Sequence, residues 1–176
     1  MVLLTRQNTI GTRRIFEGQI VNLRVDEIRH PDGHTLTREV VEHNGGVVVA
    51  CQPAPGKVIL IKQYRYTIDE ELIELPAGRL EKGENPLLAA QRELIEETGY
   101  KAKDWQELPS MYSAPGFSTE VLYVFRATRV SFVGKSLDED EETEVLIIPV
   151  EEAWQLVASG AIRDAKTMAV LALLRG

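Results

Sequence analysis

Cysteine is almost absent from the sequence, since Cys51 is the only one among 176 residues. A single cysteine can form no disulfide within the chain, and it provides no set of thiolates for a metal ion. Because Cys51 ends the apolar run 47–51, we expect a buried structural thiol. A chain of this length can bury enough apolar surface to fold without covalent or metal cross-links.

Long apolar runs and a targeting signature are also lacking. No segment approaches the roughly 20 apolar residues that a membrane-spanning helix needs. Residues 1–6 contain neither an extended apolar stretch nor the cleavage signature of a signal peptide. The sequence therefore predicts a cytoplasmic protein with no membrane partner.

An excess of positive charge is missing as well. The chain has 20 Lys and Arg residues against 27 Asp and Glu residues, which gives a formal net charge of −7. A protein that binds nucleic acid regardless of sequence needs a basic face, so we expect no nucleic-acid partner. An anionic phosphate substrate would also be repelled unless cations intervene.

The predicted elements follow the order strands, helix, strands, helices. Apolar alternation and turn residues predict strands over 20–29, 35–42, 46–52, 57–65, 71–75, 105–112, 120–130 and 145–148. Helices are predicted over 86–98, 151–158 and 165–174. Asn85, Pro86 and Gly99 are typical of the N-cap, the first position and the C-terminal end of the first helix. This order indicates an α/β (α+β) protein with a mixed sheet on which helices pack.

The first 43 residues differ from the rest of the chain. They contain a predicted hairpin around the turn 31–33 (Pro-Asp-Gly) and no predicted helix. We expect an N-terminal antiparallel β subdomain over 1–43, either a small separate unit or one that packs on a second subunit, and a main domain over 44–176. The histidines lack the spacing of a metal site and are expected on the surface or in the hairpin: His30, His34 and His43.

Helix 86–98 is predicted to have one apolar and one acidic face. At 100° per residue its leucines and Ile95 fall on one side, which we expect to be buried, whereas its glutamates fall on the other. Glu93 and Glu97 are like charges one turn apart, an arrangement that costs about 0.2–0.5 kcal/mol. Arg92 can pair with Glu96, which relieves only that glutamate.

A divalent cation would relieve the remaining negative charge on this helix. Oxygen ligands with no His or Cys nearby favour Mg²⁺ or Mn²⁺ over Zn²⁺. Magnesium commonly combines one or two carboxylates with waters and phosphate oxygens, which fits a phosphate-processing site. Charge alone leaves an alternative open, namely a solvent-exposed acidic helix face.

Residues 78–100, GRLEKGENPLLAAQRELIEETGY, resemble the Nudix box position for position. The matching positions are Gly78, Glu84, Arg92, Glu93, Leu94, Glu96, Glu97, Gly99 and Tyr100, the last in place of an aliphatic residue. The resemblance implies the Nudix fold, in which a mixed β-sheet lies between helices. It also implies Mg²⁺-dependent hydrolysis of a pyrophosphate, with metal ions that neutralise phosphate oxygens and activate a water.

The resemblance implies metal ligands within the box and just before it. Glu93, Glu97 and the main-chain carbonyl of Ala77 would be ligands. Glu96 would be a further ligand or a partner of one.

The resemblance also implies residues that support the metal ligands and the chemistry. Arg92 would hold the glutamates by charge-assisted hydrogen bonds, and Glu84 would support the cluster. The acidic run 138–144 matches a loop that supplies the general base, with Glu139 as base and Glu141 near the metal, or the reverse. A solvated loop is the alternative for this run.

The flanks of the box resemble those of ADP-ribose pyrophosphatases. Residues 113–120, SAPGFSTE, are similar to a Ser-Pro-Gly-x-x-x-Glu loop with one residue added, and a plain turn is the alternative. Residues 63–65, Gln-Tyr-Arg, are similar to a motif whose arginine meets a phosphate, with a surface arginine as the alternative. The substrate-binding residues predicted in this way are Arg65, Gly78, Pro115, Gly116 and Glu120.

Among possible substrates the flanking loop favours ADP-ribose, which would give AMP and ribose 5-phosphate. FAD, NADH or a nucleotide sugar are alternatives, and a non-catalytic Nudix ligand-sensing domain is an alternative of another class. Similar ADP-ribose pyrophosphatases are dimers whose N-terminal subdomain reaches the partner, so a homodimer is expected. Phe16 and Arg29 are candidates for such contacts, with ordinary packing as the alternative.

Overall fold

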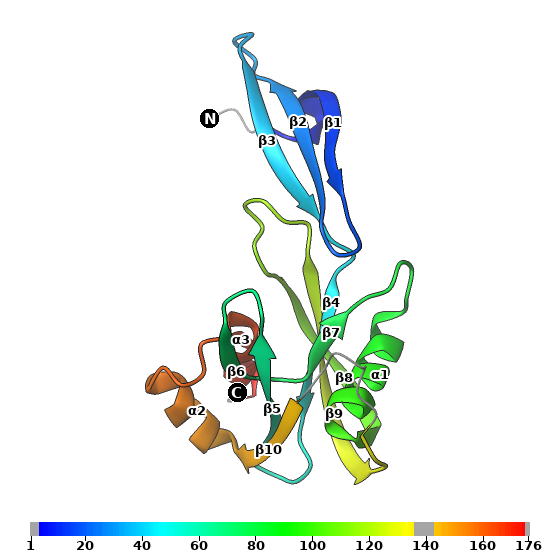
Figure 1. Ribbon diagram of the computed structural model, residues 1–176, viewed down its shortest axis with the longest axis vertical. Coiled ribbons are helices and arrows are strands. Elements are labelled where there is room, and N and C mark those ends of the chain that lie inside the picture. Colours follow the sequence, from blue (N-terminus) through cyan, green and yellow to red (C-terminus); the bar gives the residue numbers. More distant parts are fainter. Residues whose placement is uncertain (1–3, 136–142, 175–176) are drawn as a thin grey trace. The chain divides into compact units, whose positions relative to one another are not determined.

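The computed structural model describes residues 4–135 and 143–174 (Figure 1). The chain forms two compact units. The N-terminal unit contains Met1–Gly45 and Tyr112–Val121, and the main unit contains Gly46–Met111 and Leu122–Gly176. The polypeptide therefore contributes two separate stretches to each unit.

The N-terminal unit is built on an antiparallel sheet in the order β1-β2-β3. It comprises η1 (Arg6–Asn8), β1 (Thr9–Glu17), β2 (Asn22–Arg29) and β3 (Thr35–Glu42). The predicted hairpin corresponds to β2 and β3. Strand β1 was not among the predicted strands, because its sequence TIGTRRIFE does not alternate and most of its residues are exposed. Its pairing with β2 shifts register twice, which also disrupts a period of two.

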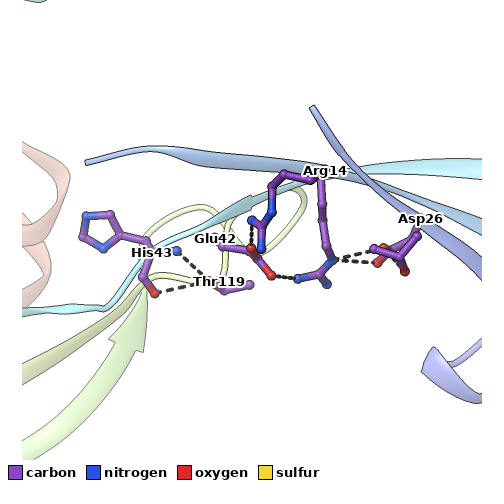
Figure 2. A network of polar contacts seen from close by, with 7 residues as sticks. Arg14, Asp26, Glu42, His43 and Thr119 are labelled. Carbon is purple, nitrogen blue, oxygen red and sulfur yellow. Dashed lines mark hydrogen bonds and ion pairs between the residues drawn. The ribbon is translucent and has the colours of Figure 1, made fainter. Parts of the chain in front are cut away.

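Ion pairs connect the three strands of this sheet (Figure 2). Arg24 of β2 lies 3.0 Å from Asp26 on the same strand and also pairs with Glu42 of β3. Glu42 receives a second guanidinium from Arg14 of β1. Hydrogen bonds from these two arginines hold the pKa of Glu42 below its usual range, although partial burial opposes the shift. One carboxylate thus binds the two outer strands and the central strand together.

The segment 112–121 is attached to β3 through main-chain hydrogen bonds. The Val41 N–H donates to the Phe117 carbonyl at 2.8 Å, and the Thr119 N–H donates to the Val41 carbonyl at 3.0 Å. The His43 N–H donates to the Thr119 hydroxyl at 2.9 Å (Figure 2). These bonds make the segment part of the N-terminal unit, although the segment is far from β3 in the sequence.

The described residues of the main unit form two sheets and three helices. The strands are β4 (Gly46–Cys51), β5 (Lys57–Arg65), β6 (Glu70–Glu74), β7 (Ala77–Arg79), β8 (Tyr100–Tyr112), β9 (Val121–Phe132) and β10 (Thr143–Pro149). The helices are α1 (Pro86–Thr98), α2 (Val150–Ala158) and α3 (Ala165–Leu173). One sheet has the order β7-β4-β9-β8, with β4 and β9 parallel and β4 and β7 antiparallel. The other has the order β10-β5-β6, with antiparallel pairs.

Strand β4 is buried on both faces, so its residues divide between two apolar clusters. Odd-numbered residues 47–51 pack with Ala90 and Leu94 of α1. Val48 and Ala50 pack with residues of α2 and α3. Helix α1 therefore covers one face and α2 and α3 the other (Figure 1), which confirms the expected mixed sheet between helices.

The single thiol lies in the first of these clusters. Cys51 is fully buried, as expected, and burial raises its pKa to about 12. None of the described helices combines the length and the apolar character needed to span a bilayer.

Some boundaries followed from the sequence and others did not. Helix α1 has the predicted bounds, the Asn85 side chain accepts from the Leu87 N–H at 2.9 Å, and Gly99 has φ 75°. Strand β8 begins before the predicted residue 105. In this first part only the small Ala102 is buried, between two exposed lysines, so the sequence shows little apolar alternation there. Strand β7 has three residues, too few to show a period.

Candidate active site

Helix α1 buries the side that carries two of its glutamates. Glu93 is 8% exposed and Glu97 is 2% exposed, whereas Leu88 is 60% exposed. The expectation that all the leucines would be buried was therefore wrong for Leu88. The alternative of a solvated acidic face was wrong for Glu93 and Glu97. Small residues, Ala89 and Ala90, share the buried side and allow the helix to approach β4 and β7 closely.

The residues at the start of β7 are fitted to these two carboxylates. The Ala77 N–H donates to Oε2 of Glu97 at 2.9 Å. A Cβ atom built on Gly78 would lie 1.9 Å from Cδ of Glu93, so only glycine leaves room for that side chain. Each of the two residues therefore accommodates one buried glutamate. A buried carboxylate is strongly disfavoured without such partners, which indicates a specialised arrangement rather than ordinary packing.

Arg92 forms ion pairs with three glutamates. Its guanidinium lies 2.8 Å from Glu96, 2.8 Å from Glu93 and 3.3 Å from Glu84. The predicted pair with Glu96 is confirmed, and the structure adds the other two glutamates. Burial opposes the charge on Arg92, yet the carboxylates together raise its pKa above the usual range. One positive charge on Arg92 therefore faces three carboxylates, so the cluster keeps an excess of negative charge.

Glu84 is held at both of its oxygens. Oε2 accepts from the Glu81 N–H at 2.9 Å, and Oε1 accepts from Nε of Arg92 at 3.3 Å. Burial raises its pKa, but these two donors prevail and the pKa is lowered overall. Glu84 thus remains ionised at the start of the box helix and fixes the guanidinium from outside that helix.

Arg65, at the end of β5, forms a two-point ion pair with Glu74. Nε lies 2.7 Å from Oε1 and Nη2 lies 2.9 Å from Oε2, while the Glu74 side chain is 1% exposed. Lys166 at the start of α3 also pairs with Glu74 and lies 3.0 Å from Asp164. The guanidinium is therefore oriented by a buried carboxylate, unlike a surface arginine at a strand end. Glu74 and Lys166 were not predicted, because they meet across 92 residues of sequence.

The other predicted residues lie elsewhere in the chain. Pro115 and Gly116 are exposed and belong to the N-terminal unit, in a turn closed by a hydrogen bond from the Ser118 N–H to the Ala114 carbonyl. Glu120 belongs to the same unit. Its carboxylate lies 3.3 Å from Nδ1 of His43, a contact with no counterpart in the sequence pattern. The acidic residues predicted to supply the base, Glu139 and Glu141, lie outside the described residues.

The structure brings together the glutamates of α1, Glu84, Arg92 and the turn at 77–78. Residues 42–171, which include this cluster, match the family model described as "NUDIX domain". The chain belongs to the Nudix family. This confirms the resemblance seen in the box, and the protein is a Nudix hydrolase. Members of the family typically use a divalent metal ion.

Other comparisons cover nearly the whole Nudix hydrolase. Residues 8–41 match a model described as "Nucleoside diphosphate sugar hydrolase N-terminal domain". The chain is 42% identical over 163 residues to the ADP-ribose pyrophosphatase of Bacillus subtilis (strain 168), covering 92% of this chain and 88% of that protein. It is 37% identical over 174 residues to the methanol dehydrogenase activator of Bacillus methanolicus, covering 98% and 94%.

A solved structure shares the fold. It is titled "Crystal structure of ADP compounds hydrolase" and superposes with a TM-score of 0.83, covering 95% of this chain and 91% of that chain. The sequence identity is 20%, so this likeness supports the architecture alone.

Proposed function

We propose that this Nudix hydrolase cleaves the pyrophosphate of ADP-ribose to AMP and ribose 5-phosphate with Mg²⁺. The observation that carries the proposal is the pair of buried glutamates on α1, Glu93 and Glu97, fitted to the turn at 77–78. Relatives about 40% identical named ADP-ribose pyrophosphatase support the choice of substrate. We also propose an N-terminal β subdomain over residues 1–43 and a Nudix hydrolase domain over 44–176, a division supported by the separate N-terminal unit that begins with Met1–Gly45.

The donor set of the cluster fits magnesium. Its side chains offer carboxylate oxygens and no imidazole or thiol among the described residues of the box, which suits a hard cation such as Mg²⁺, with Mn²⁺ as an alternative. Glu93, Glu97 and the Ala77 carbonyl would hold the ion, with Glu96 as a further ligand. When bound, the ion supplies charge neutralisation of the pyrophosphate and a water of lowered pKa.

Residues around the ligands keep them charged and in place. Arg92 lies between Glu84, Glu93 and Glu96, so it limits their repulsion and restricts their rotamers. Gly78 leaves the space that Glu93 occupies. The proton of the attacking water passes in our proposal to Glu139, with Glu141 near the metal, or the two roles are reversed.

Five residues are proposed to bind the substrate. Arg65 would bind a phosphate with the guanidinium that Glu74 orients. Gly78, Pro115, Gly116 and Glu120 complete the proposed contacts. We also propose a homodimer that involves the N-terminal unit. This is supported by exposed apolar side chains on β1, among them Phe16 at 57% exposure.

The test of the substrate proposal is product analysis by chromatography in the presence of Mg²⁺. The panel contains ADP-ribose, NADH, FAD, a nucleotide sugar and 8-oxo-dGTP. We expect ADP-ribose to give AMP and ribose 5-phosphate with the highest kcat/KM. A higher value for another compound would refute ADP-ribose as substrate but preserve the hydrolase. Cleavage of none would favour a ligand-sensing domain.

A nucleotide sugar is the second candidate substrate. The match of residues 8–41 to a nucleoside diphosphate sugar hydrolase N-terminal domain favours it specifically. ADP-ribose and nucleotide sugars share a nucleoside diphosphate joined to a sugar, so the panel must compare both under the same conditions.

Replacing Gly78 by Ala is expected to impair catalysis without unfolding the protein. The added methyl group would collide with Glu93 and displace its carboxylate, and a shift of about 1 Å near the chemistry can cost about 10²-fold in rate. Steady-state kinetics would measure kcat/KM, and thermal unfolding would check the fold. Gly11→Ala is the matched control, because its new Cβ would meet nothing nearer than 3.5 Å. Wild-type kinetics in Gly78→Ala would contradict the placement of Glu93.

A further inference from the structure

The turn between β2 and β3 gathers two histidines and an aspartate. The His30 N–H donates to the His34 carbonyl at 2.9 Å, and the Gly33 N–H donates to the His30 carbonyl at 2.8 Å. These bonds close the hairpin and place the two histidines opposite each other. Their rings stack with centroids 4.5 Å apart and planes 25° from parallel. The sequence predicted surface histidines without metal-ligand spacing, whereas the hairpin brings two of them to one face.

Asp32 contacts both imidazoles through one carboxylate oxygen. Its Oδ1 is 2.9 Å from Nδ1 of His30 and also contacts Nδ1 of His34. The main-chain N–H of His34 donates to the same carboxylate at 3.1 Å. This bond is the largest of the causes that lower the pKa of Asp32 to about 2. The carboxylate therefore stays ionised at neutral pH and attracts cationic donors.

We propose that His30, Asp32 and His34 form a binding site for a divalent transition-metal ion of the zinc type. One potential ligand atom from each residue lies within 4.8 Å of the other two. Ligand atoms around a tetrahedral Zn²⁺ with bonds of about 2.0–2.1 Å are about 3.4 Å apart, so side-chain rotations suffice to close the site. The ion would replace the protons through which the imidazoles now contact Asp32.

The chemistry of the donors separates this site from the box. Two imidazole nitrogens and one carboxylate oxygen favour Zn²⁺, Ni²⁺, Co²⁺ or Cu²⁺ over Mg²⁺. Three protein ligands leave a further position for water or another donor. The side chains of Asp32 and His34 are 58% and 51% exposed, so an ion can reach them from solvent. This inference is independent of the proposed hydrolytic function, because none of the three residues is among the proposed metal ligands or substrate contacts of that function.

The test uses the full chain with saturating Mg²⁺, so that sites made of oxygen donors are filled before Zn²⁺ is added. Calorimetry would give the Zn²⁺ affinity, and NMR of the imidazole protons would identify the ligands. We expect the ring resonances of His30 and His34 to shift and those of His43 to stay unchanged. His34→Gln should weaken Zn²⁺ binding by at least about tenfold, since even partners outside the ligand shell contribute 10–100-fold.

His43→Gln is the matched control, because it removes an imidazole from the same unit but outside the turn. It should keep the wild-type Zn²⁺ affinity. Equal affinity in wild type and His34→Gln would overturn the site. Loss of Zn²⁺ binding in Glu97→Gln but not in His34→Gln would likewise overturn it and assign the ion to the box. Amide spectra of each variant would show that the hairpin is still folded.

Discussion

Glu97→Gln is expected to lower kcat/KM by about 10²–10⁴-fold, which corresponds to losing several kcal/mol of metal-assisted stabilisation of the transition state. Glu97 is 2% exposed and accepts a hydrogen bond from the Ala77 N–H. Glutamine has the same shape and can accept that bond, so the local structure should persist. What it loses is the negative charge that our proposal assigns to metal binding.

Steady-state kinetics across a range of Mg²⁺ concentrations would measure this effect. The variant should also need more Mg²⁺ for half-maximal activity. Glu81→Gln is the matched control, because it makes the same chemical change within the box at an exposed position. It should behave like the wild type. Unchanged turnover in a folded Glu97→Gln variant would refute Glu97 as a metal ligand.

Glu74→Gln is expected to destabilise the fold by about 3 kcal/mol at pH 7. Removing one partner of a buried ion pair leaves the others uncompensated, at a cost of about 3–5 kcal/mol. We place the value at the lower end because Arg65 is 36% exposed and Lys166 keeps Asp164 at 3.0 Å. Urea denaturation would measure the free energy of unfolding. Glu71→Gln on the same strand removes an exposed pair with Lys62 and should change the free energy of unfolding far less than Glu74→Gln, because solvent screens exposed ion pairs.

The effect of Glu74 should depend on pH in a defined direction. Burial raises its pKa, but Arg65 and Lys166 outweigh burial and lower the pKa below 4.5 in the folded state. A depressed folded pKa contributes stability that is present above the unfolded value and is lost as the pH falls through the folded value. The unfolding free energies of wild type and Glu74→Gln should therefore converge in acid. Parallel curves from neutral pH into acid would contradict the assigned ion pair.

Local features of the sequence predicted the box helix well. The bounds of α1 followed from Asn85 and Gly99, whose capping interactions involve only neighbouring residues. The angular positions of the residues, at 100° each, also identified the acidic side of the helix. They could not show that this side is buried, because the fit depends on the turn at 77–78, which reaches Glu97 across 20 residues. Polarity alone therefore predicted a buried Leu88 and allowed a solvent-exposed position for the glutamates, whereas Leu88 is exposed and Glu93 and Glu97 are buried.

Contacts between distant residues account for most of what the sequence did not predict. Glu74 and Lys166 are 92 residues apart and meet only in the fold. His43 and Glu120 come together because the segment 112–121 adds to β3. The histidines of the β2–β3 turn show no familiar ligand spacing. They lie close together because main-chain hydrogen bonds close the hairpin, and the spacing of histidines in the sequence does not reveal those bonds.

The attachment of segment 112–121 to β3 limits how modular this protein can be. Its main-chain bonds to Val41 and the bonds of the Thr119 hydroxyl with the His43 backbone mean that two separate stretches of the chain form the N-terminal unit. A single cut near residue 43 would separate this segment from the strand to which it is hydrogen-bonded, so residues 1–43 are not a removable accessory. A recombinant graft of either the three-stranded sheet or segment 112–121 onto another scaffold would therefore have to carry the other as well.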